Sequence, residues 1–124
     1  MERMFDHEKL HVYQDAIAFC AWWEEAAIGC RGLTTVKDQL DRASTSVPLN
    51  IAEGSTLRGS REYRRYLDTA WALLAEVQTA LEIARDVGYI QPADFGRLEA
   101  LAIETSKTLY GLLRKISDSS SPKR

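Results

Sequence analysis

Four arginines lie close together in the middle of the chain, and their side chains suit contacts with phosphate. Only one acidic residue, Glu62, interrupts the cluster, whose members are Arg58, Arg61, Arg64 and Arg65. A guanidinium group is planar and permanently charged, so it can hold a phosphate through two N–H donors. The alternative is a solvated helix face, on which Arg64 pairs weakly with Asp68 one turn later. The cluster is therefore a candidate nucleic-acid site, although the net charge of −2 is unlike that of a free nucleic-acid-binding domain.

The other residues that could do chemistry stand alone. His7 and His11 are four residues apart, as two metal ligands on one helix face would be, but no third ligand converges on them. Glu53 is a candidate general acid or base. Its place near Pro48 favours a structural role instead, in which it ties down a helix end through Arg42. The sequence thus predicts a protein that is not an enzyme and that uses no metal or cofactor.

Composition and charge are those of an ordinary globular domain. The 124 residues fit one domain, and 45% of them are hydrophobic while 27% are charged. Cys20 and Cys30 stand in no metal-binding spacing and are interpreted as reduced thiols. The N-terminus is charged, and no apolar run approaches the roughly 18 residues of a membrane span. We therefore expect a cytoplasmic protein without a membrane segment.

Apolar residues recur at steps of three and four in four segments, which predicts four helices. The predicted helices cover residues 8–28, 34–54, 60–87 and 93–116. The connections between them are short, and short connections join antiparallel neighbours. The expected fold class is all-α, an antiparallel up-down-up-down four-helix bundle over residues 1–116. Residues 117–124 are polar and are expected to form a flexible tail.

The spacing also predicts which residues form the core. The face of the second helix carries Val36, Leu40, Ala43, Val47 and Ile51, and that of the third carries Tyr63, Leu67, Ala70, Leu74, Val77, Leu81 and Ala84. The face of the fourth carries Phe95, Leu98, Leu101, Ala102, Thr105, Leu109, Leu112 and Ile116. Ser60 is the expected N-cap of the third helix, and Gly88 is its expected C-terminal stop.

The first helix is apolar around much of its circumference. Its predicted core face carries Leu10, Tyr13, Ile17, Cys20 and Ala27, and this face is widened by Val12, Phe19, Trp22 and Trp23. A peripheral helix of a monomer needs only one apolar stripe. The surplus aromatic residues therefore predict a subunit interface, made by Phe19, Trp22, Trp23 and Trp71. Alternatively, these aromatics fill a core of small residues such as Ala16.

Residues 39–54 break a local rule. Apolar spacing continues on both sides of Pro48, yet proline lacks the N–H that would bond to the Ser44 carbonyl, at a cost of about 3 kcal/mol in an ordinary helix. Two interpretations stand: two short helices that meet at Pro48, or one continuous helix with a kink, which we prefer. Hydroxyls of Ser44, Thr45 and Ser46 are expected to serve the freed backbone groups. Asn50 is expected to bond an orphan carbonyl or a neighbouring helix.

This segment also carries a family resemblance. Gln39-Leu40, Arg42-Ala43, Ser46-Val47-Pro48 and the run Asn50-Ile51-Ala52-Glu53-Gly54 resemble the signature of the 23S rRNA intervening-sequence proteins. The run from Lys9 to Ala16 resembles the first-helix opening of that family, and Glu62-Tyr63, Arg65-Tyr66-Leu67, Ala70 and Leu74-Ala75-Glu76 resemble its third helix. The resemblance covers about residues 5–116. Trp71-Ala72-Leu73 departs from the small residues usual there, which puts the local packing or an assembly contact in doubt.

The resemblance implies a four-helix bundle that assembles as a ring-shaped homopentamer, a helical scaffold or adaptor without established catalytic residues. A related branch includes the accessory variability determinant of diversity-generating retroelements, which binds a reverse transcriptase and nucleic acid. The expected partners are therefore further copies of the chain, with RNA, DNA or a nucleic-acid enzyme as the alternative. Within the motif, Gln39, Arg42, Ser46, Pro48, Asn50, Glu53 and Gly54 are expected to serve the architecture.

Overall fold

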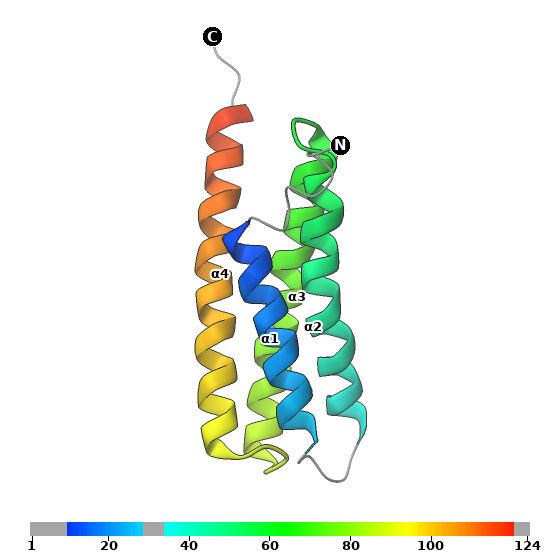
Figure 1. Cartoon of the computed structure of the whole chain (residues 1–124), viewed down its shortest axis with the longest axis vertical. Helices are drawn as coiled ribbons and strands as arrows, with labels where there is room; N and C mark the ends of the chain where they lie inside the picture. The colour runs from blue at the N-terminus through cyan, green and yellow to red at the C-terminus, as the bar shows by residue number, and fades with distance from the viewer. Residues whose placement is uncertain (1–9, 29–33, 121–124) are drawn as a thin grey trace.

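The computed structural model describes residues 10–28 and 34–120 and consists of four helices (Figure 1). These helices are α1 (His11–Ala27), α2 (Thr34–Ser55), α3 (Arg61–Asp86) and α4 (Pro92–Ser120). No strand occurs in these two described ranges. The all-α fold class predicted from the apolar spacing is confirmed.

Contacts between consecutive helices show that they run in opposite directions. In each pair, a residue late in one helix meets a residue early in the next, and an earlier residue meets a later one. The contacts are Cys20–Ser44 and Trp23–Asp41 for α1 and α2, Gln39–Glu76 and Gly54–Tyr66 for α2 and α3, and Trp71–Tyr110 and Arg85–Phe95 for α3 and α4. The chain therefore passes down and up the bundle, as the colours in Figure 1 show. The bundle closes where α1 packs against α4.

The core consists of two clusters of buried side chains that follow each other along the bundle. One is built around Phe19, Trp23 and Phe95, and the other around Leu67 and Leu109. Leu73 packs against both clusters and joins them. All seven core residues predicted for α3 are buried, as are Leu40, Ala43, Val47 and Ile51 of α2. On α4 the spacing missed Leu113, which is buried beside Leu109.

The predicted core face of α1 was wrong. The buried residues are Val12, Ala16, Phe19, Trp23 and Ala27, whereas Ile17, placed in the core by the prediction, is 44% exposed. Both sets recur at helical spacing, because α1 carries apolar residues on more than one side. Spacing alone could not choose between them. The choice is made by Phe19 and Trp23, whose large rings fill the space between α2, α3 and α4 better than Ile17 and Cys20 would.

The ends of α3 agree with the prediction in position and differ in mechanism. Ser60 is the N-cap, with extended backbone angles (φ −108°, ψ 167°), but its hydroxyl makes no capping hydrogen bond. Ser60 Oγ instead donates to the carbonyl of Leu57 in the preceding loop, at 2.6 Å. At the other end Gly88 has a φ of +79°, which glycine adopts without strain and which ends the helix.

The ends of the other helices differ modestly from those predicted. α2 closes one residue later than expected, at Ser55, and α4 continues a turn beyond Ile116 to Ser120. The predicted start of the first helix at residue 8 and residues 121–124 of the predicted tail lie outside the described residues.

Gly54 lets α2 and α3 approach each other closely. A Cβ atom at this position would lie 2.9 Å from Tyr66 Cβ and 3.4 Å from Tyr63 Cδ1. The first distance is shorter than ordinary carbon–carbon contact, and Tyr66 Cβ is fixed to the backbone of α3. A side chain at position 54 would therefore push the two helices apart.

We expect Gly54→Ala to lower the free energy of unfolding by at least about 1 kcal/mol, because overpacking outweighs the helix propensity gained by removing glycine. Gly96→Ala is the matched control, since Gly96 lies within α4 and a Cβ there meets no atom within 4 Å. That control should gain about 0.5–1 kcal/mol. Urea unfolding of both variants measures the difference, and equal gains in both would contradict close packing at Gly54.

Candidate functional site

The family-like segment of α2 forms one unbroken helix. Pro48 lies inside the helix Thr34–Ser55 and is buried, so the interpretation as two short helices is excluded. The continuity of α2 agrees with our preferred interpretation, while the size of a bend at Pro48 stays a prediction.

The carbonyl that Pro48 leaves without its usual donor is bonded from a different helix. In a regular helix the Ser44 carbonyl would accept from the N–H of residue 48. Here the Cys20 thiol of α1 donates to it, with Sγ 3.1 Å from the oxygen. Burial raises the pKa of the Cys20 thiol and the charge of Glu24 raises it further, although a hydrogen bond with Ser44 acts in the opposite direction. The thiol therefore stays protonated at neutral pH and available as a donor.

The expectation that local hydroxyls would serve this carbonyl was wrong. Ser44 Oγ and Thr45 Oγ1 both donate to the carbonyl of Asp41, at 3.4 Å and 2.7 Å. A helical Ser or Thr hydroxyl reaches only the carbonyl three or four residues earlier. The Ser44 carbonyl is thus within reach of side chains at positions 47 and 48, which are valine and proline. A donor from another helix was therefore required.

Two further motif residues also bond within the bundle. Asn50 Nδ2 donates to the Ser46 carbonyl at 2.8 Å, which matches one of its two predicted roles. Gln39 joins two helices: its Nε2 donates to Glu76 Oε1 of α3 at 2.6 Å, and its Oε1 accepts from Arg42 Nη2 at 2.8 Å. The motif thus uses its polar groups to hold α2 against α3.

The predicted link between Glu53 and Arg42 was wrong. The two residues are eleven positions apart on one helix, which separates them by about 16 Å along its axis. The Arg42 guanidinium bonds to Gln39 instead, and Glu53 is exposed. The backbone carbonyl of Glu53 ends α2 by accepting from Thr56 Oγ1 at 2.7 Å. Glu53 therefore contributes its backbone to the helix end and not its carboxylate.

A polar hollow of about 270 Å³ lies between α2 and α3. Its lining residues are Asn50, Glu62, Arg65, Tyr66 and Thr69. A wider, open depression of about 740 Å³ lies beside residues 35–46 of α2. The hollow offers one guanidinium, one carboxylate, hydroxyls and an amide, which suit polar contacts with a ligand or partner.

The four predicted arginines lie at one end of α3 but do not share one face. Arg64 Nε pairs with Asp68 at 3.5 Å, as the solvated-face alternative required, whereas Arg65 lines the hollow on the side of α2. Successive helix positions differ by about 100°, so these two side chains diverge. Arg58 and Arg61 are exposed. Arg42 does not extend the cluster, because its partner Gln39 lies against Glu76, far along α3.

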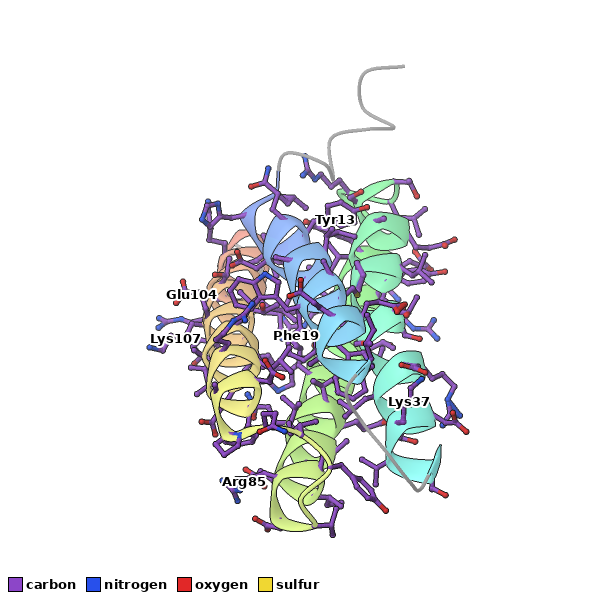
Figure 2. All side chains as sticks on the ribbon, turned by 60° about the horizontal axis from the view of Figure 1, so that its bottom comes forward. Tyr13, Phe19, Lys37, Arg85, Glu104 and Lys107 are labelled. Carbon is purple, nitrogen blue, oxygen red and sulfur yellow. The ribbon has the colours of Figure 1, made fainter. Side chains whose placement is uncertain are left out.

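Two of the four residues predicted at a subunit interface belong to the core of the subunit. Phe19 is 4% exposed and Trp23 is 2% exposed, and Trp23 Nε1 donates to Asp41 Oδ1 at 2.7 Å. Figure 2 shows Phe19 pointing into the bundle. These two side chains fill the core, as the alternative interpretation proposed, because they lie on the buried side of α1.

The other two predicted interface residues reach the surface. Trp22 lies under the guanidinium of Arg97, which is 4.8 Å from the ring centroid. Trp71 is 41% exposed and packs on Tyr110 of α4, which is 52% exposed, with ring centroids 5.9 Å apart. The sequence prediction missed Tyr110. The seven-residue spacing from Ile103 to Tyr110, which puts both on one exposed helix side, was the available signal.

The structure also bears on metal binding and membrane spans. Among the described residues, no three His, Cys, Asp or Glu side chains converge as metal ligands would. His11 is exposed, and His7 lies outside the described residues. Of the helices in the described part of the chain, none is both long and apolar enough to cross a membrane.

The bond from Cys20 predicts an energetic coupling with Pro48. Cys20→Ala should lower the free energy of unfolding by about 1–2 kcal/mol, because it leaves the Ser44 carbonyl without a donor. The loss should shrink in a Pro48→Ala background, where residue 48 regains an N–H that reaches the same carbonyl. Cys20→Ser, which keeps a donor, is the matched control. Urea unfolding of the four variants of the cycle gives the coupling energy, and an equal loss in both backgrounds would contradict it.

Comparison with known proteins places this architecture in a family. The family described as 23S rRNA-intervening sequence protein matches residues 8–111, which include α1 to α3 and most of α4. No curated protein matches the chain. Because the match covers most of the chain, including Pro48 and the groups that hold α2 against its neighbours, this protein belongs to the 23S rRNA-intervening sequence protein family.

Proposed function

We propose that this protein is a non-enzymatic helical scaffold or adaptor that assembles with copies of itself, as a ring of five subunits, the number that the family resemblance implies. The observation that carries the proposal is the exposed aromatic pair Trp71–Tyr110 on α3 and α4. Large aromatic side chains at a surface are typical of protein interfaces.

The outer side of α1 supports the same proposal. α1 already buries Val12, Ala16, Phe19 and Trp23 in the core, yet Ile17 and Ile28 remain exposed on its other side. A helix with one packed side needs no second apolar side to fold. A second surface in contact with α1 would explain why these side chains are apolar.

The polar residues of the motif support a role that is not enzymatic. Cys20, Gln39 and Asn50 direct their polar atoms to the Ser44 carbonyl, to Glu76 and to the Ser46 carbonyl. Groups used in this way hold the helices together and are not aimed at a substrate. A cytoplasmic location is part of the proposal, since a protonated thiol used as a donor suits a reducing compartment.

Sedimentation velocity at micromolar concentration tests the assembly. We expect a species several times heavier than the 14.0 kDa subunit, and a single monomeric species would overturn the proposal. Replacing both Trp71 and Tyr110 by serine should weaken association while circular dichroism stays helical, because both rings are already exposed. Leu49→Ser is the matched control, since Leu49 is an exposed apolar residue on α2.

A second candidate function is that of an accessory protein that binds RNA or DNA, alone or together with a nucleic-acid enzyme. It is favoured by the exposed Arg58, Arg61 and Arg65 at the end of the bundle where α4 also ends (Figure 1). The exposed Arg114 and Lys115 lie on that last part of α4. Positive side chains from two helices at one end would bind phosphates more strongly than those of a single turn.

Gel shifts with structured RNA and with duplex DNA at about 50 mM salt test this candidate. The double variant Arg61→Glu/Arg65→Glu should abolish a shift, and the salt dependence of binding should become shallower by about one unit of log–log slope for each phosphate that the variant no longer binds. Arg85→Glu, at the other end of α3, is the control. If neither nucleic acid shifts with the native chain, this candidate fails.

A further inference from the structure

The outer side of α1 carries four exposed residues at a regular spacing. They are Ile17, Ala21, Glu24 and Ile28, at successive steps of four, three and four residues, so they share one side of the helix. This side points away from the core, since Ile17 is two positions, or about 200° of helix rotation, from the buried Phe19. Ile28 is 85% exposed. We call this set the α1 stripe.

A second stripe with the same spacing lies on α4. Ile103, Lys107, Tyr110 and Arg114 are all exposed and are also separated by steps of four, three and four. In Figure 2 the Lys107 side chain points from α4 away from the bundle. Trp71 of α3 extends this surface through its contact with Tyr110. We call this set the α4 stripe.

The two stripes are chemically complementary. Residues 11–27 of α1 contain Asp15, Glu24 and Glu25 and no lysine or arginine, so the α1 stripe is apolar and acidic. The α4 stripe is apolar and basic, since it alternates Ile103 and Tyr110 with the two cations Lys107 and Arg114. Lys37 and Arg97 lie near the α1 stripe, but Lys37 pairs with Asp41 at 3.0 Å and Arg97 lies over Trp22.

The stripes cannot meet within one subunit. Tyr110 contacts α3 through Trp71, so the α4 stripe lies on the side of α4 that faces α3. The side of α4 that faces α1 is a different one, where Arg97 meets Trp22. A contact between the stripes must therefore join two copies of the chain, and it would be heterologous, because each copy presents one stripe to each neighbour.

The residue types also select a direction for this contact. With the two helices antiparallel and in the register set by the shared spacing, the facing pairs are Ile28–Ile103, Glu24–Lys107, Ala21–Tyr110 and Ile17–Arg114. This arrangement joins two isoleucines, forms an ion pair, and leaves room for the tyrosine ring over a small residue. With the helices parallel, the pairs are Ile17–Ile103, Ala21–Lys107, Glu24–Tyr110 and Ile28–Arg114. The parallel arrangement retains one favourable apolar pair and forms no ion pair.

We infer that the α1 stripe of one subunit docks antiparallel on the α4 stripe of the next, with Glu24 facing Lys107. This inference rests on the proposed self-assembly and adds which two surfaces meet. Since the contact is heterologous, its repetition produces a ring where the rotation closes and a filament where it does not.

A charge exchange tests the contact on the full-length chain. Glu24→Lys and Lys107→Glu should each raise the dissociation constant of assembly by about tenfold or more, because each places like charges opposite one another. The double variant Glu24→Lys/Lys107→Glu should recover most of the lost affinity. Glu53→Lys is the matched control, since it makes the same change of charge on an exposed position of α2. Sedimentation velocity reads all four, with circular dichroism as the check on folding.

A disulfide test gives an independent readout of the register. In a background of Cys20→Ser and Cys30→Ser, a chain with Ile28→Cys is mixed with a chain with Ile103→Cys under mild oxidation. We expect a cross-linked dimer from this pair and little from Ile28→Cys mixed with Leu49→Cys, whose new thiol is equally exposed but lies on α2.

The outcomes separate the two proposals. If the native chain is monomeric, both self-assembly and the stripe contact are overturned. If the native chain assembles but the double charge variant recovers nothing and the Ile28/Ile103 cysteine pair does not cross-link, the stripe contact alone is overturned. Recovery together with cross-linking of the expected pair supports the contact.

Discussion

The missing hydrogen bond at Pro48 is the constraint on which much of the arrangement depends. A proline within an unbroken helix leaves the Ser44 carbonyl without its normal donor, and the only side chains on α2 placed to reach that carbonyl are those of Val47 and Pro48. The Cys20 thiol supplies the donor and so ties α1 to the middle of α2. Trp23 bonds to Asp41 one turn away, which holds α1 at the same place with a second contact. A helix that would be strained on its own is in this way supported by its neighbour.

On its other side, α2 is held to α3 by close approach and by polar contacts. Gly54 allows the backbones to approach near Tyr66, and Gln39 bonds to Glu76 four turns away. The family-like motif thus supports both neighbours of α2: the residues next to Pro48 contact α1, while Gln39 and Gly54 contact α3. This distribution explains why a motif that looks unusual for a helix is a feature of the architecture, and it agrees with membership of a family defined over nearly the whole bundle.

The two apolar sides of α1 connect the fold to the proposed assembly. One side fills the core with Phe19 and Trp23, and the other leaves Ile17 and Ile28 at the surface. On α4 the exposed side likewise carries Ile103 and Tyr110 among basic residues. Exposed apolar groups tend to associate because burial removes them from water, whereas the charges beside them decide which surface is the partner. The proposed contact between the stripes uses both effects.

The sequence by itself determined the four helices, the core faces of α2 and α3, the stop at Gly88 and the family. Each of these rests on local spacing, on backbone freedom or on a continuous motif, which are properties of neighbouring residues. The tertiary structure decided the buried side of α1, the donor to the Ser44 carbonyl and the separation of Arg64 from Arg65. Two apolar sides of similar strength compete on α1, and only the space left by the other helices selects Phe19 and Trp23 over Ile17. The Cys20 bond likewise joins residues 24 positions apart, and no local pattern records a contact between side chains that only folding brings together.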